Sequence, residues 1–523
     1  MSNEKRDKVS FSSQLSENIW GHRFMDGQRG PEYVLEFLNV MVGTDYQLDA
    51  DSYYRKKSTG LRKFIFEGDK EGRSNEIARL DDEERKKLNY AISDREKIDV
   101  VREFFRNLEV PIYDGRGKPA NRSWYAKSLY PLHDSLLFFE LRKKGNSISY
   151  ERNFYARGGE LYYLMLSYGT RNNPELKASI EKRLNNLLSK NKPIESIVDS
   201  ISNALTLQKP EEKPAPLKEG NGKEKYPYLP DDIDIELFRK FAIEFNNLIK
   251  LNIDMYEMFK LLVSLATFQI KRYLLSRVTE DNKTVMFFDC MDGQVEQVRK
   301  QSAISFNQNE LLIKQKYEDT FEKIFNEKIQ NEAYVAENLE VWKKDDGEKF
   351  FELLDLGNLH KRTKQRAIST LAKCEDYNDV KTKLFNIVKD IIDDQLKKHQ
   401  IPIIRGLVRD GGMGGFRTGT NYRYFMSDNF IKILVFINVK PNQPIEYSDF
   451  LKSIYNDYGI IIGEVEAKKS GIYARSQLNV SYFQKNEYSL REKLRQNGLL
   501  IEYSDATAMI RNPFEYTEDE VSL

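Results

Sequence analysis

Residues 490–514 read LREKLRQNGLLIEYSDATAMIRNPF, and this stretch decides how the end of the chain folds. It begins with a helical pattern, turns at the Gly-Leu-Leu sequence, and continues into an arm of β-prone residues. Two more helical patterns precede it, over 430–438 and 447–458, with a proline-containing turn between them. Two helices, a tight turn and a β-arm follow one another in this order in a winged helix. The sequence therefore predicts a winged-helix-like domain over residues 401–523.

The same region carries a local excess of basic side chains. Residues 466–495 contain three acids and seven basic residues, a net charge of +4 (seven minus three) in a chain whose net charge is +1. The basic residues are Lys468, Lys469, Arg475, Lys485, Arg491, Lys493 and Arg495. On the predicted helix 487–497, Arg491 and Arg495 lie one turn apart, and Leu490 and Leu494 face the core. This pattern favours contact with DNA or RNA, with protein docking or a plain solvated surface as alternatives.

A second basic segment lies upstream, over residues 401–424. It contains a single acid, Asp410, and aromatic side chains separate its arginines, which are Arg405, Arg409, Arg417 and Arg423. The run Gly411-Gly412-Met413-Gly414-Gly415 is glycine-rich, but no helix start follows it, as a phosphate cradle requires. We therefore expect a flexible, arginine-bearing loop that adds to the nucleic-acid contact.

One pattern supports an enzymatic alternative. The apolar run 459–463 leads into Glu466 and Lys468, the acid–x–lysine spacing of PD-(D/E)xK nucleases. If both side chains lay on one face of a strand, the acid would help to hold Mg²⁺ and the lysine would orient the attacking water. Such a site also needs an upstream acid, and Asp449 is the candidate, although it lies in a helical pattern. A magnesium ion enters only under this alternative; otherwise no cofactor is expected.

A clear compositional break divides the chain before this region. Residues 208–231 hold five prolines, several charged residues and Gly-Asn-Gly, which predicts an extended, solvated linker. We expect a helical domain over 1–207, a mainly helical middle domain over 232–400, and the C-terminal domain beyond it. The predicted fold class is mainly α with small α+β elements, in several domains.

Local patterns give the expected elements of the first two domains. Helical spacing or a good first turn marks 31–42, 81–108, 129–144 and 160–168, and Pro31 sits at a favourable first-turn position. In the middle domain, Thr284–Asp289 reads as a short buried strand. Cys290 follows this strand, where it is expected to be an inert packed thiol.

Composition and motif content restrict the possible functions. The chain has 523 residues, only four histidines and two cysteines, and no Gly-x-x-x-x-Gly-Lys-Ser/Thr sequence. A P-loop NTPase, a disulfide framework and a cysteine-rich zinc site are therefore disfavoured. The chain lacks a run of 18 uncharged apolar residues and an apolar leader at its start, so we expect a cytoplasmic protein without a membrane partner.

The C-terminal run quoted above, together with FYARGGELYYL at 154–164, resembles uncharacterised bacterial proteins encoded in anti-phage defence or DNA-processing gene islands. The resemblance covers about half of the chain and includes no diagnostic catalytic motif. It implies a subunit that works beside a separate helicase, ATPase or nuclease, and it assigns no functional residue.

Taken together, these patterns favour a non-catalytic subunit of a bacterial defence or DNA-transaction complex. Its C-terminal basic segments would contact nucleic acid, and its helical regions would dock partner proteins. Two alternatives remain at this point, the Mg²⁺-dependent nuclease and a scaffold that binds only protein.

Overall fold

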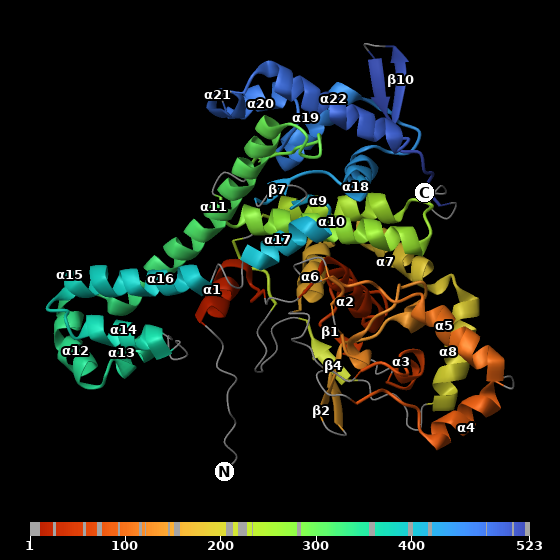
Figure 1. Cartoon of the computed structure of the whole chain (residues 1–523), viewed down its shortest axis with the longest axis horizontal. Coiled ribbons are helices and arrows are strands. Elements are labelled where there is room, and N and C mark those ends of the chain that lie inside the picture. The colour runs from red at the N-terminus through yellow and green to blue at the C-terminus, as the bar shows by residue number, and fades with distance from the viewer. Residues whose placement is uncertain are drawn as a thin grey trace.

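Helices make up most of the chain in the computed structural model, in agreement with the sequence (Figure 1). The structure describes residues 11–24, 28–55, 59–70, 76–92, 95–113, 118–120, 122–144, 147–150, 157–205, 213–217, 227–232, 234–279, 284–354, 361–395, 401–416, 421–476, 478–504 and 507–517. None of the helices within these ranges is long and apolar enough to cross a membrane.

The N-terminal part of the chain combines helices with strand β1 and one antiparallel strand pair, β2 and β3. Its elements are α1 (Phe11–Trp20), α2 (Gly30–Gly43), β1 (Ser52–Arg55), α3 (Thr59–Ile65), α4 (Asp82–Ala91), α5 (Arg95–Arg106), η1 (Trp124–Ala126), η2 (Asp134–Leu136), β2 (Leu141–Lys144), β3 (Ser147–Tyr150), α6 (Gly158–Thr170), α7 (Pro174–Ser189) and α8 (Lys192–Leu205). Pro31 lies in the first turn of α2, as predicted, and Glu32 accepts the main-chain N–H of Arg29 at 2.8 Å.

Two predicted helices differ from the structure in this part. The pattern at 81–108 forms two helices, α4 and α5, instead of one. The helix predicted at 129–144 is wrong, because its end is strand β2, which pairs with β3 in an antiparallel hairpin. Gly145-Asn146 separates these strands in the sequence, and that dipeptide is typical of a turn.

The middle of the chain contains the longest helices. Its elements are β4 (Lys213–Pro216), α9 (Ile235–Ile249), α10 (Met255–Ser276), β5 (Met286–Phe287), α11 (Glu296–Ile329), α12 (Glu332–Lys344), α13 (Glu348–Leu353), α14 (Lys361–Leu371), α15 (Tyr377–Asp379), η3 (Val380–Leu384) and α16 (Phe385–Gln395). Helix α11 has 34 residues, so it is about 50 Å long. It links the centre of the molecule to a lobe formed by α12 to α16 (Figure 1).

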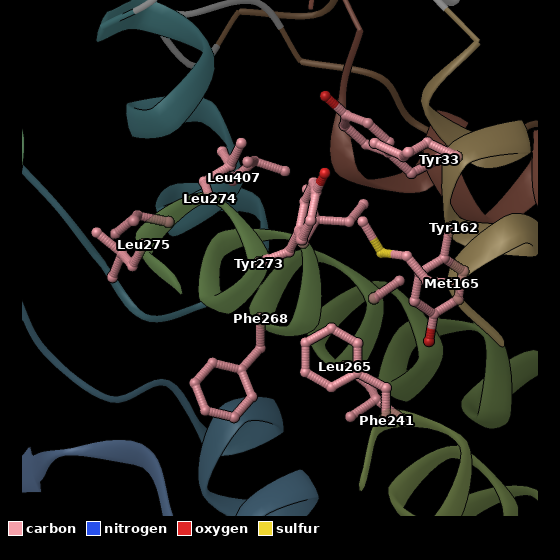
Figure 2. Close-up of a cluster of buried hydrophobic side chains, with 14 of the residues drawn as sticks. Tyr33, Tyr162, Met165, Phe241, Leu265, Phe268, Tyr273, Leu274, Leu275 and Leu407 are labelled. Atoms are coloured by element: carbon pink, nitrogen blue, oxygen red, sulfur yellow. The ribbon is translucent and has the colours of Figure 1, made fainter. Parts of the chain in front are cut away.

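Helix α10 is the central element of the core. Asp254 caps its start by accepting the N–H groups of Tyr256 and Glu257 at 2.9 and 3.1 Å. Nearly all of its side chains are buried, because the sequence is apolar on every face of the helix. Figure 2 shows side chains of α10 among Tyr33 of α2, Tyr162 and Met165 of α6, Phe241 of α9, and Leu407 of α17 (Ile401–Asp410).

This core does not stop at the predicted domain boundaries. One continuous cluster of buried apolar side chains extends from Leu15 to Ile510 and includes members from all three predicted domains. The solvated linker predicted over 208–231 is wrong at 213–217, because β4 pairs with β1, and Ala215 and Leu217 are buried. Alternation of small or apolar residues with lysine and proline gives β4 one face that the core can accept.

The C-terminal part follows with short strands between helices. Its elements are α17 (Ile401–Asp410), β6 (Gly414–Gly415), β7 (Arg423–Tyr424), α18 (Asp428–Asn438), β8 (Ile445–Glu446), α19 (Tyr447–Tyr458), β9 (Ile460–Ile461), α20 (Glu464–Lys469), α21 (Ile472–Ser476), α22 (Val480–Gln496), β10 (Leu500–Ser504) and β11 (Thr507–Ile510). Strands β10, β11 and β8 form a three-stranded antiparallel sheet in that order.

A parallel strand pair joins the middle of the chain to its C-terminal part. Strand β5, at the strand predicted for 284–289, pairs with β9 in parallel. Gly459 ends α19 with a φ of 69°, and a Cβ atom there would lie 2.2 Å from the carbonyl oxygen of Thr284. Glycine is therefore needed both for the left-handed turn and for the close approach of the two chains.

Candidate nucleic-acid interface

Helix α22 presents a polar and aromatic face to solvent. It begins at Val480, seven residues earlier than predicted, because Asn479 caps it by accepting the N–H of Ser481 at 2.9 Å. Phe483, Asn486, Leu490 and Leu494 are buried. The side chains exposed on the opposite face are Ser481, Gln484, Lys485, Tyr488, Arg495 and Gln496. Tyr488 is 62% exposed, which is high for a large aromatic side chain.

A buried asparagine fixes the position of this helix. The Asn486 amide nitrogen donates to the carbonyl oxygens of Phe288 and Ile462 at 2.8 and 3.1 Å. Its side-chain oxygen accepts the N–H of Cys290 at 2.8 Å. These three bonds attach α22 to the ends of β5 and β9, so its exposed face has a defined orientation on the molecule.

The predicted arginines and lysine of the second half of α22 are held by acids of the same chain. Arg491 contacts Glu502 of β10 at 3.0 Å, and Lys493 contacts Asp292 at 2.8 Å. Arg495 pairs with Glu492 one turn back on the helix. Arg491 and Arg495 therefore reach solvent with their charge already balanced, and the side chain of Lys493 is mostly buried.

The remaining basic residues of 466–495 lie near the first half of α22. Lys468 pairs with Glu464 on α20, and Glu464 also accepts the Gln484 amide at 3.2 Å, so α20 contacts α22. Hydrogen bonding to Lys468 lowers the pKa of Glu464. Lys469, Arg475 and Lys485 are exposed, and no carboxylate among the described residues pairs with them. The guanidinium of Arg475 donates to the carbonyl oxygen of Ser470 at 3.0 Å.

The segment 401–424 differs from the flexible arginine-bearing loop that we expected. Its start is helix α17, and Arg405 makes a two-point contact with Glu310 at 2.7 and 2.9 Å. Arg409 pairs with the adjacent Asp410 at 2.8 Å. Acids thus balance Arg405 and Arg409, whose assignment to the nucleic-acid contact stays a prediction. Arg417 lies outside the described residues.

Arg423 makes the most buried ion pair of this group. It is 1% exposed, and its Nε atom lies 3.0 Å from a carboxylate oxygen of Asp289, which is fully buried. Burial raises the pKa of Asp289, and the charge of Arg423 acts in the opposite direction. Because it has no access to solvent, Arg423 is a structural residue of the described fold and does not belong to a nucleic-acid contact.

The nuclease alternative required Glu466 and Lys468 to share one face of a strand, and that expectation is wrong. The strand ends at Ile461, and both residues lie on α20, where positions two apart point to different sides. Glu466 is buried and Lys468 is exposed, while Asp449 lies on α19 with an exposed side chain. Among the described residues no group of three or more His, Cys, Asp or Glu side chains is arranged to hold a metal ion.

Two exposed residues of the interface, Gln484 and Tyr488, were not predicted from the sequence. The pattern around Leu490 and Leu494 located the helix but not its first two turns. Phe483, Asn486 and Leu490 continue the buried face toward the N-terminus, and Gln484, Lys485 and Tyr488 then fall on the opposite side. Asn479 as a helix cap was the signal that could have shown this.

The chain was compared with known protein families, proteins and structures. A scan against protein-family models found none that matches, and searches of curated proteins and of solved structures likewise found no match.

Proposed function

We propose that residues 428–510 form a winged helix whose α22 face contacts nucleic acid. We propose further that the chain works as a non-catalytic subunit of a cytoplasmic DNA-transaction or defence complex. The observation that carries the proposal is the exposed face of α22 around Gln484, Lys485 and Tyr488, on a helix anchored by Asn486.

The order of the elements supports the winged-helix interpretation. Helix α18, strand β8, helices α19 and α22, and the hairpin β10–β11 follow one another, and β8 adds to the hairpin beside β11. The short segment β9 to α21 is an insertion between the second and third helices of this arrangement. In this arrangement α22 is the helix that approaches the nucleic acid, and the hairpin is the wing.

The chemistry of the exposed face suits a phosphate backbone with base edges beside it. The lysine ammonium groups of Lys485 and Lys469 can contact phosphates, and the Gln484 amide and the Tyr488 ring can contact bases. Acids of the same chain already balance Arg491 and Arg495. We therefore expect moderate affinity, carried by the first half of α22 and the end of α20.

A separate surface supports docking of partner proteins. Val100 and Phe104 lie one turn apart on α5 and are 68% and 46% exposed. On this proposal the pair forms part of an apolar contact with another protein, since exposed apolar patches mark such surfaces. A partner such as an ATPase, helicase or nuclease would supply the catalytic step, which agrees with the gene-island resemblance.

Charge reversal at Lys485 tests the interface directly. We expect Lys485→Glu to weaken binding of a labelled 30-base-pair DNA duplex about tenfold at low salt, because it replaces a phosphate contact by repulsion. Tyr488→Ala should weaken it severalfold. The measurement is a fluorescence-anisotropy titration of each variant.

The matched control is Lys328→Glu, which changes an exposed lysine in the last turn of α11, a helix that ends at Ile329. The affinity of this variant for the DNA duplex should stay within about twofold of the wild-type affinity, because Lys328 lies outside the interface. Equal affinity of Lys485→Glu and Lys328→Glu would contradict the assignment of α22.

A further inference from the structure

A cleft separate from the α22 face lies between α9, the last turn of α10, the residues that enter β5, and the end of α19. Its volume is about 530 Å³, within the range of small-molecule sites. Leu237, Leu275, Val285 and Met286 supply apolar walls, and Leu275 and Met286 are fully buried. Polar side chains occur mainly at the rim, where Asp234, Glu236 and Asp457 contribute carboxylates.

Arg272 is the most buried charged residue that lines this cleft. It is 8% exposed, and its guanidinium lies over the rings of Phe241 and Tyr458, 4.9 and 4.6 Å from their centres. Nη1 donates to both carboxylate oxygens of Glu244 at 2.8 Å. No described residue accepts a hydrogen bond from Nε or Nη2, and Arg272 lines the cleft. Nε and Nη2 therefore remain as a planar pair of N–H donors on a side chain that lines the cleft.

A buried network holds these donors in place. The Gln269 amide donates to Glu244 at 2.8 Å, and the Tyr162 hydroxyl donates to Gln269 at 2.6 Å. The three side chains come from α6, α9 and α10, and each is buried. A guanidinium fixed in this way loses little conformational entropy when a ligand binds.

The charges around the cleft disfavour an anionic ligand. Glu244 already neutralises Arg272, and Asp457 neutralises Lys240 across the rim at 2.5 Å. The helices α10 and α19 both end here, so their C-terminal carbonyl groups add negative potential. At the start of α9, Asp234 already accepts the N–H groups of Glu236 and Leu237. Phosphates and free carboxylates are therefore poorly accommodated.

We propose that this cleft binds an uncharged purine of the guanine type, as the free base or nucleoside. The O6 and N7 acceptors of guanine are adjacent and match the two unused N–H directions of an arginine fork. A flat heterocycle also fits apolar walls formed by Leu237, Val285 and Met286. The ribose would lie toward the carboxylates at the rim, and a 5′-phosphate would be repelled there. The site is independent of the nucleic-acid interface on α22.

Equilibrium dialysis of the full-length chain with guanosine tests the ligand class. We expect a dissociation constant of about 100 μM or tighter, and inosine, which keeps O6 and N7, should bind equally well. Loss of N7 in 7-deazaguanosine should weaken binding about tenfold, and adenosine and GMP should bind more weakly than guanosine. No guanosine binding at millimolar concentration, or binding of 7-deazaguanosine or adenosine as tight as that of guanosine, would overturn the proposal.

Two variants locate the site. Arg272→Lys keeps the positive charge but removes the fork, so guanosine affinity should fall at least about tenfold. Because that change also touches the Glu244 network, Ser276→Trp serves as a second variant; it fills the cleft from the end of α10 and leaves Arg272 in place. With an unchanged thermal unfolding midpoint, Ser276→Trp should abolish guanosine binding. Retained binding in this variant would place the ligand elsewhere and contradict the proposal.

Discussion

Replacement of Arg423 by methionine is expected to lower the free energy of unfolding by about 3–5 kcal/mol, because it leaves the buried Asp289 carboxylate without its counter-charge. Both side chains are essentially inaccessible to solvent. Asp289 also accepts the N–H of Met291 at 2.9 Å, so its position is fixed by the turn after β5. Urea unfolding at pH 7 measures the change.

The double variant Asp289→Leu/Arg423→Met provides the control. Removing both charges eliminates the uncompensated carboxylate, so most of the lost stability should return. The exposed Arg475→Met should change stability by less than about 0.5 kcal/mol. An Arg423→Met protein as stable as the wild type would show that Asp289 and Arg423 are not a buried pair.

Replacement of Lys271 by methionine is expected to raise the free energy of unfolding by about 2–4 kcal/mol at pH 7 and below. Lys271 is 2% exposed, and its ammonium lies 2.6 Å from the sulfur of Met286 and 4.7 Å from the centre of the Tyr424 ring. No carboxylate of the described residues pairs with it, since the nearby Glu310 is held by Arg405. Burial lowers the pKa of Lys271 to about 7.

The depressed pKa of Lys271 makes the free energy of unfolding of the wild type increase with pH. Between pH 7 and 10.5 the unfolded chain binds a proton at Lys271 that the folded chain does not bind, so stability rises with pH across this window. Below pH 7 both states are protonated, and the full cost of the buried charge is present. Lys271→Met should lack this rise, and its advantage over the wild type should shrink as the pH approaches 10.

Chemical unfolding of both proteins between pH 6 and 9.5 measures this difference. The exposed Lys328→Met is the matched control and should follow the wild type at every pH. Parallel profiles for the wild type and Lys271→Met would contradict a desolvated lysine at this position.

Two C-terminal elements whose limits depend on nearby residues were predicted correctly. Helix α19 has the predicted limits, and the arm after Gly498 forms the β10–β11 hairpin. Capping residues, helical periodicity and turn glycines act over a few residues, so a single sequence contains them. The strand at β5 was also recognised, but its partner β9 lies more than 170 positions along the chain, and no local pattern specifies that pairing.

Partners of charged residues could not be predicted for the same reason. Glu310 neutralises Arg405 from 95 positions away, Asp289 neutralises Arg423 from 134, and Asp292 neutralises Lys493 from 201. Counting charges along the sequence therefore overstated the basic character of residues 401–424. The segment 213–217 shows the converse error, because proline and lysine suggested solvent while β1 provided a pairing edge.

One feature of the sequence indicates the buried polar site around Arg272. Lys271-Arg272 is a charged pair in the mostly apolar second half of α10, and charged residues are seldom buried without a specific partner. That pattern indicates a buried polar site. It does not identify Glu244 as the partner of Arg272, and it does not show that no described carboxylate pairs with Lys271.

The central claim, that the α22 face contacts nucleic acid, is tested most directly by a salt titration of DNA binding. The affinity for a 30-base-pair duplex should fall linearly on a double-logarithmic plot against salt concentration, with a slope of about −3 to −4 for three to four phosphate contacts. The slope for Lys485→Glu should be shallower by about 1. Absence of binding at 50 mM salt, or an affinity independent of salt, would contradict the account and favour a protein that binds only other proteins.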